Sequence, residues 1–193
     1  MTKRETRGGI PAEIRADATA IKVSGYAAVF NQEANIGGYF REIILPGAFR
    51  KALANSDVPF LINHDGLPLA RTRSGTLKLT EDDHGLKIDT DLDAADPDVM
   101  RIVPKMKRGD LDKMSFAFRA VVQRWDDTQD PPLRTVEELE LYDVSIVTEP
   151  AYDGTEIGLR SLDEARKETR RQHNATAFAR RKAASEAKFR RIS

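Results

Sequence analysis

The chain has 193 residues, of which 40% are hydrophobic and 32% charged, and its 31 basic residues balance its 31 acidic ones. This composition is typical of a folded globular protein and excludes an intrinsically disordered chain. No run of about 18 apolar residues is present to span a bilayer, and the absence of cysteine excludes disulfides, zinc–thiolate sites and a thiol nucleophile. The basic start leads into no apolar signal segment, so we expect a protein that is not secreted.

The first half of the chain predicts mainly strands. Residues 19–30 are rich in β-forming side chains, and residues 40–57 predict a short strand, a Pro-Gly break and a short helix. Residues 58–65 form a short apolar strand that ends at His64. Residues 74–93 predict a hairpin, because apolar side chains alternate on both sides of a polar turn.

The second half predicts one helix and two more strand regions. Residues 96–110 repeat apolar side chains at helical spacing, although Pro104 should kink or interrupt the helix. Strand regions follow at 112–124 and 135–148. Six or seven strands with two short helices predict an α+β fold: a mainly antiparallel six- or seven-stranded β-barrel with short surrounding helices.

Charge is unevenly placed along the chain. The predicted organisation is an N-terminal extension (1–18), a main domain (19–160) and a basic C-terminal tail (161–193). The tail holds ten Lys or Arg against four Asp or Glu, and its thin apolar stripe predicts a helical or mobile segment. Both a solvated helix and a docking or targeting segment fit this pattern.

One hydroxyl stands out in the segment DLDKMSFAFRA. Strand alternation places Met114, Phe116 and Phe118 on one face and Ser115 on the other, wetter face. Small neighbours leave room for a molecule to approach Ser115. An ordinary half-buried strand has the same pattern, so the pattern alone does not establish catalysis.

The three histidines differ in their surroundings. His84 lies in the polar hairpin turn and His173 in the basic tail, and both positions predict solvated side chains. His64 follows an apolar strand at the point where the chain leaves the core, where a rigid scaffold presents side chains to a cleft. The acidic residues near His64 and His84 lack the spacing of a metal site, so we expect no metal.

A Ser and a His can act as a hydrolase site when the imidazole accepts the hydroxyl proton and a third group orients the imidazole. The strand region 135–148 offers three acids for that role: Glu138, Glu140 and Asp143. Alternation puts Glu138 and Glu140 on one face and Asp143 on the face of the leucines, so Asp143 needs a bulge or a polar pocket to act. The residues alone leave this choice open.

Five segments occur in an order that resembles a known family: GYAAVFN…FREIILPGAF, PFLINHD, GLKIDTDLD, DKMSFAFRA and ELELYDVSIVTEPAY. The succession, residues 20–158, resembles the prohead maturation serine proteases of tailed bacteriophages. The resemblance implies His64 as base and Ser115 as nucleophile. That family is similar in fold to the herpesvirus capsid-assembly protease, and laying the final strands together implies Glu138 as the third catalytic group. The arginine pair that helps bind the oxyanion there has no counterpart after LYDVSIVT.

The resemblance also implies a role. It predicts a serine endopeptidase that cleaves scaffold protein, or the scaffold-like segment of the major capsid protein, inside the procapsid in the host cytoplasm. These proteins are the expected partners, with a homodimer as a further option, and no cofactor, membrane or nucleic acid is expected. Self-cleavage is expected between Asp153 and Arg180, which would remove the basic tail.

Two other functions fit parts of the sequence. One is a non-catalytic capsid-interior binding protein that keeps the protease fold. The other is a nucleic-acid binder that uses the Lys and Arg residues of the tail. A covalent serine probe separates the first from an enzyme, and salt-dependent DNA binding by the tail would support the second.

Overall fold

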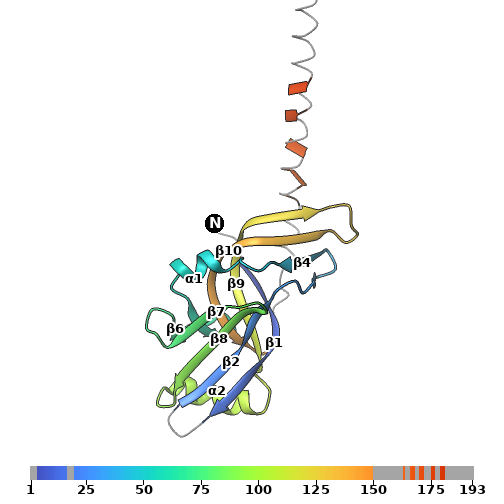
Figure 1. Ribbon diagram of the computed structural model, residues 1–193. Coiled ribbons are helices and arrows are strands. Elements are labelled where there is room, and N and C mark those ends of the chain that lie inside the picture. The colour runs from blue at the N-terminus through green and yellow to red at the C-terminus, as the bar shows by residue number, and fades with distance from the viewer. Residues whose placement is uncertain are drawn as a thin grey trace, which may run out of the picture. The chain divides into compact units, whose positions relative to one another are not determined.

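The computed structural model describes residues 4–16 and 20–149 and isolated positions between 163 and 180. The chain divides into two units, Met1–Ile157 and Gly158–Ser193. In the first unit, ten strands pair into one mixed sheet that carries two helices (Figure 1). The elements are β1 (Glu5–Ala16), β2 (Ala20–Val29), β3 (Ala34–Ile36), β4 (Phe40–Ile44), α1 (Arg50–Asn55), β5 (Pro59–Ile62), β6 (Asp65–Arg71), β7 (Leu77–Glu81), β8 (Gly85–Asp93), α2 (Pro97–Lys107), β9 (Lys113–Asp126) and β10 (Leu133–Val147).

Strand β10 organises the sheet. It pairs antiparallel with β9, and Figure 1 shows these two strands as a long pair. It also pairs parallel with β4 along Leu133–Val136 and with β5 along Val144–Ile146. The remaining pairs are antiparallel, and the order is β3-β4-β10-β9-β1-β2-β8-β7, with β6 joined through β5.

The predicted mainly β class with two short helices is confirmed, but the predicted barrel is not shown. Among the described residues, β3 and β7 each have one neighbour, so the sheet is open at both ends. The edge of β10 opposite β9 is divided between two short strands, β4 and β5, which pair onward with β3 and β6. The predicted number of strands was too low because β1, β3 and β6 lack a regular apolar alternation.

Strand β1 comes from the segment that the sequence analysis left as an N-terminal extension. It lies inside the sheet, between β9 and β2. Its first residues include buried Glu5 and Arg7, which pair with other buried charges instead of packing as apolar side chains. A search for apolar periodicity therefore does not find this half of the strand.

The hydrophobic core contains the apolar face predicted for the segment around Ser115. Phe116 lies between Phe49 and Phe118, with ring centroids 5.4 and 5.1 Å away, and all three rings are buried. Phe49 comes from the start of α1, which buries Ala52 against the same core. This packing fixes β9 through its apolar side chains.

Helix α2 follows the predicted periodicity. Asp96 caps its N-terminus by accepting a hydrogen bond from the backbone N–H of Asp98 at 2.8 Å, and Pro97 occupies the first turn. The helix buries the four predicted positions, Val99, Ile102, Val103 and Met106. The expected interruption at Pro104 does not occur, since the helix continues to Lys107. Burial of the apolar face on both sides of the proline stabilises the helix across it.

The predicted hairpin at residues 74–93 is confirmed as β7 and β8, with Leu79 opposite Ile88. His84 lies in its turn, where it is exposed and packs edge-on against Tyr26 at 4.5 Å between ring centroids. His173 and the expected self-cleavage segment from Asp153 lie outside the described residues, apart from the isolated positions that follow Leu162. Among the described residues, His84 thus contacts no other candidate catalytic residue.

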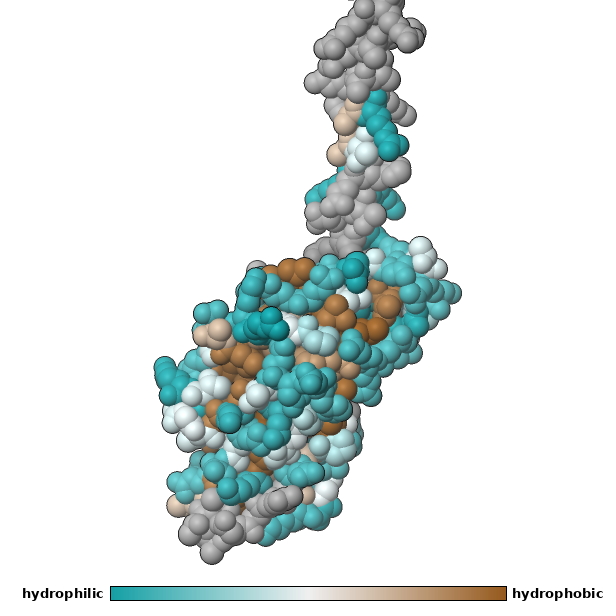
Figure 2. Space-filling view, in the orientation of Figure 1, coloured by the Kyte–Doolittle hydropathy of each residue, from teal (hydrophilic) through white to brown (hydrophobic). Residues whose placement is uncertain are grey.

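In the second unit, the described residues are helical and exposed, including Arg166, Arg170 and Arg180. In the part of the chain that is described, no helix is long and apolar enough to cross a membrane. Figure 2 shows mainly hydrophilic side chains on the face in view, with hydrophobic ones in smaller areas among them.

Candidate active site

Ser115 is held on β9 by the packing of its neighbours. Phe116 and Met114 point into the core, so Ser115 points to the opposite face, as alternation predicts. That face is not wet at this position, because Ser115 is 0% exposed. Its Oγ lies 2.7 Å from His64 Nε2. The structure thus brings together the two residues that the sequence analysis singled out first.

His64 occupies a tight turn between β5 and β6. Ile62 pairs with Asp65, so Asn63 and His64 form a two-residue hairpin loop, and both have positive φ, 49° and 61°. This is the geometry of a type I′ turn, which costs a histidine on the order of 1–2 kcal/mol relative to glycine. Strained backbone conformations of this kind cluster at functional positions, so the strain at His64 fits a functional role.

Hydrogen bonds from the end of β10 hold the turn. The backbone N–H of Asn63 donates to the carbonyl of Ile146 at 3.0 Å, and the Asn63 side chain accepts from the backbone N–H of Thr148 at 3.1 Å. The backbone N–H of His64 donates to Ser145 Oγ at 3.2 Å. The imidazole is therefore positioned by strand β10, which also carries the candidate acids.

The acid that meets His64 is Asp143. Its Oδ1 lies 2.6 Å from His64 Nδ1, and its side chain is 2% exposed. Ser115, His64 and Asp143 thus form a continuous hydrogen-bonded chain from hydroxyl to imidazole to carboxylate. In this arrangement the carboxylate can hold the imidazole in one tautomer while the other ring nitrogen faces the hydroxyl.

A bulge in β10 explains how Asp143 leaves the leucine face. Leu141 pairs with Phe118 but Asp143 pairs with Ala117, so Tyr142 is an extra residue in β10. The insertion reverses the alternation, and Asp143 and Ser145 then share the face of Ser115. The sequence showed that Asp143 needed such a bulge but not that one was present.

The sequence analysis expected Glu138 beside His64, but the structure places it elsewhere. Glu138 Oε2 lies 2.6 Å from Lys51 Nζ, and its side chain is partly exposed. Glu140 pairs with Arg119 at 3.0 Å on the solvated side of the sheet. Both acids lie earlier on β10 than Asp143, and their side chains pair with Lys51 and Arg119 instead of reaching the imidazole.

Two further residues contact the carboxylate, and the sequence analysis missed both. Ser145 Oγ donates to Asp143 Oδ1 at 2.9 Å, and the guanidinium of Arg4 pairs with Asp143 Oδ2. Ser145 could have been found from its position two residues after Asp143 on the same strand. Arg4 had no such signal, since it lies in a short basic segment without periodicity.

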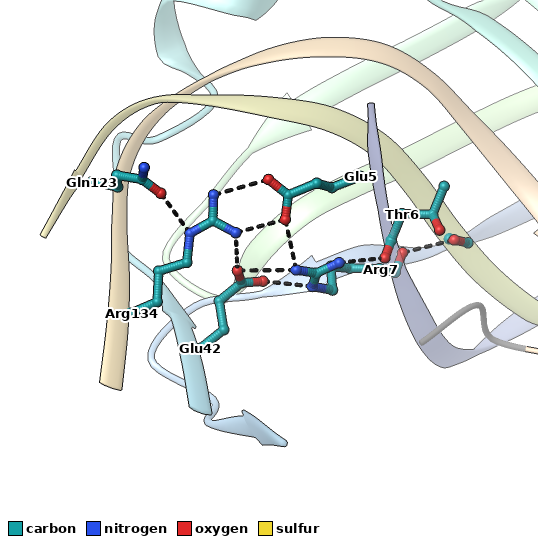
Figure 3. Close-up of polar contacts among 7 residues, drawn as sticks. Glu5, Thr6, Arg7, Glu42, Gln123 and Arg134 are labelled. Atoms are coloured by element: carbon teal, nitrogen blue, oxygen red, sulfur yellow. Dashed lines mark hydrogen bonds and ion pairs between the residues drawn. The ribbon is translucent and has the colours of Figure 1, made fainter. Parts of the chain in front are cut away.

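Next to this site, four charged side chains are buried together: Glu5, Arg7, Glu42 and Arg134, each 5% exposed or less (Figure 3). Arg134 bonds to Glu5 at 2.6 Å and Glu42 at 2.9 Å, and Arg7 bonds to the same two carboxylates. Burial on its own raises the pKa of Glu5, but Arg134 and Arg7 more than offset this and hold that pKa below its ordinary value. This contribution to stability is therefore present at neutral pH and is lost as the pH falls through the lowered pKa.

Arg134→Gln should lower the free energy of unfolding by about 3–5 kcal/mol, because it leaves two buried carboxylates with one guanidinium. Urea denaturation of the purified variant measures this loss. Arg124→Gln is the matched control, since Arg124 is 70% exposed and lies 3.6 Å from Glu137 on the same strand pair. It should unfold like wild type. Equal stability of the two variants would contradict a structural role for the buried cluster.

No group of three His, Asp or Glu among the described residues could hold a metal ion. The groups that the site does bring together are a hydroxyl, an imidazole and a carboxylate. Together they can transfer a proton from an attacking hydroxyl and return it to a leaving group.

Comparison with known proteins agrees with the sequence resemblance. The prohead protease of Enterobacteria phage HK97 is 33% identical over 145 residues, which cover 72% of this chain and 60% of that protein. No solved structure is significantly similar to the chain. The profile of the caudovirus prohead serine proteases matches residues 11–168, a stretch that includes Ser115, His64 and Asp143. The chain therefore belongs to the caudovirus prohead serine protease family.

Proposed function

We propose that this chain is a serine endopeptidase that matures phage capsids. The observation that carries this proposal is the chain of hydrogen bonds from Ser115 Oγ through His64 to Asp143, at 2.7 and 2.6 Å. Three side chains from β9, the β5–β6 turn and β10 meet in the arrangement that serine hydrolases use. Membership of a serine protease family supports the same reaction.

In the proposed reaction, Ser115 Oγ attacks the carbonyl carbon of a peptide bond and gives its proton to His64 Nε2. The tetrahedral intermediate collapses when His64 returns that proton to the leaving amine, which leaves an acyl-enzyme. Water then attacks the acyl group, and His64 transfers a proton from the water to Ser115. The cycle consumes one water, cleaves one C–N bond and uses no cofactor.

We assign the third role to Asp143 in place of Glu138. The support is geometric: Asp143 bonds to His64 Nδ1, while Glu138 bonds to Lys51. A buried carboxylate at Nδ1 stabilises the imidazolium that forms during attack. Arg4 and Ser145 leave little conformational freedom to that carboxylate.

The proposed substrates are the scaffold protein or the scaffold-like segment of the major capsid protein, cleaved inside the procapsid in the host cell. The family and the HK97 relative, which is named a prohead protease, support this role. Coexpression with the capsid protein encoded by the same phage tests it, with intact-mass spectrometry of both proteins. A capsid protein that stays full length, together with no labelling of Ser115 by a fluorophosphonate, would favour a non-catalytic binding protein.

Self-cleavage between Asp153 and Arg180 should shorten the chain to a body that ends after the last strand. The basic segment that follows β10 is the expected leaving part, because its composition gives it few apolar contacts. Mass spectrometry of purified wild type over time should show the shorter form, while Ser115→Ala stays full length. A wild-type chain that remains intact while it cuts its substrate would contradict this prediction.

A further inference from the structure

The nucleophile is covered by the start of β1. Ser115 pairs with Gly8 across the β1–β9 ladder, and Ser115 Oγ lies 2.7 Å from the carbonyl oxygen of Arg7. A Cβ on Gly8 would lie 2.6 Å from the Cβ of Ser115, so β1 passes directly against the serine. A substrate carbonyl must reach the position beside Oγ that the Arg7 carbonyl now holds.

The same carbonyl competes with His64 for the hydroxyl hydrogen of Ser115. Ser115 has one hydroxyl hydrogen but two acceptors at 2.7 Å, the Arg7 carbonyl and His64 Nε2. While the hydrogen points to the carbonyl, His64 cannot accept it. Moving the Arg7 carbonyl away removes this competition and leaves the hydrogen to His64.

Residues Arg4–Gly8, called the strap below, can separate from β9 at little cost in apolar burial. They contain no aliphatic or aromatic side chain, so lifting the strap uncovers little apolar surface of its own. A hinge follows the strap, since Gly9 has a φ of 116° and the register of the β1–β9 pair shifts between Gly8 and Ile10. Beyond the hinge, β1 stays in the sheet through its pairing with β2.

The buried charges divide evenly between the strap and the body. The strap contributes Glu5 and Arg7, which bond to each other at 2.9 Å. The body contributes Glu42 and Arg134, which also bond to each other at 2.9 Å (Figure 3). Lifting the strap thus leaves a neutral pair on each side. It avoids an uncompensated buried charge, which would be strongly destabilising.

The contact of the strap with the catalytic acid also allows release. Arg4 is 44% exposed on its side chain, so it returns to water at little cost when it leaves Asp143. Asp143 then keeps its bonds to His64 and Ser145. The strap also lies outside residues 11–168, which match the family profile.

We propose that the strap is an internal occupant of the substrate site, and that an extended substrate peptide pairs with β9 along Ser115–Phe118 after the strap has lifted. This inference rests on the proposed function, since it takes Ser115 as the nucleophile. The ligand class is a peptide backbone in β conformation, which adds to a strand edge through main-chain hydrogen bonds. The closed form is latent, and the rate of reaction scales with the fraction of molecules in which the strap is open.

A disulfide lock tests this inference, because the chain has no cysteine of its own. Thr6 lies directly opposite Ala117 in the antiparallel β1–β9 pair, at a spacing that a disulfide can bridge. Thr6→Cys with Ala117→Cys should label with a small fluorophosphonate at least about tenfold more slowly when oxidised than when reduced, as followed by intact mass. Lys22→Cys with Asp91→Cys, an exposed opposite pair of β2 and β8, is the matched control and should label equally in both states.

A second variant opens the strap in the full-length chain. Glu5→Gln with Arg7→Gln removes both strap charges and keeps the neutral Glu42–Arg134 pair, so labelling should accelerate about tenfold or more. Equal labelling of the oxidised and reduced lock would overturn the strap inference and leave the proposed function standing. Failure of every form, including this variant, to label at Ser115 would overturn the proposed function and the inference with it.

Discussion

Ser115→Ala and His64→Ala should each lower the rate of capsid-protein cleavage by on the order of 10⁶ relative to wild type. Among the described residues, Ser115 supplies the hydroxyl at His64 Nε2, and His64 is the base within reach of that hydroxyl. The fold should persist, because the core beneath Ser115 is made by Phe116 and Phe118. Single-turnover cleavage of purified capsid protein measures the rate, and circular dichroism checks the fold.

His84→Ala is the matched control for the histidine substitution. His84 is exposed in the β7–β8 turn, and its ring contacts only Tyr26 among the described aromatic side chains. This variant should cleave at the wild-type rate. Undiminished cleavage by purified Ser115→Ala or His64→Ala would remove the basis of the proposed mechanism.

Asp143→Asn should be slower than wild type by about 10⁴ while Glu138→Gln cleaves nearly normally. The amide at position 143 cannot stabilise the imidazolium and favours the wrong tautomer of His64. Asn keeps the size of Asp, so the buried site can still accommodate it. Loss of the Glu138 charge removes an ion pair with Lys51, whose side chain is 72% exposed. Exposed ion pairs of this kind contribute little to the stability of the fold.

The two carboxylates lie on the same strand, so the pair of variants separates catalysis from a general effect on β10. If Glu138→Gln is the crippled, folded variant and Asp143→Asn works normally, the third role belongs to Glu138 after all.

Much of the fold could be predicted from side-chain periodicity. Helix α2 and the β7–β8 hairpin follow directly from apolar spacing and turn residues, and so does the core face of β9. The start of β1 could not be predicted this way, because buried ion pairs replace apolar contacts there. The openness of the sheet depends on which strands share an edge of β10, which no local pattern encodes.

The candidate site was predictable where it depends on residue type and family motif. Ser115 and His64 stand in two separate motifs, and the structure brings them together. The third residue depends on a single extra residue, Tyr142, which reverses which face each side chain of β10 takes. Alternation read from the sequence therefore set Asp143 apart from Glu138 and Glu140, and the resemblance then favoured Glu138, while the folded strand presents Asp143.

The long sequence separations within the site set the point during synthesis at which a peptide bond can first be cut. Ser115 contacts a residue 108 positions earlier, and His64 contacts one 79 positions later. Contacts this distant form late in folding, because closing a large loop costs conformational entropy before the contact can stabilise the chain. A chain still emerging from the ribosome has no β10 and hence no carboxylate at His64. The arrangement of Ser115, His64 and Asp143 is therefore complete only after β10 has been made and has paired beside β5.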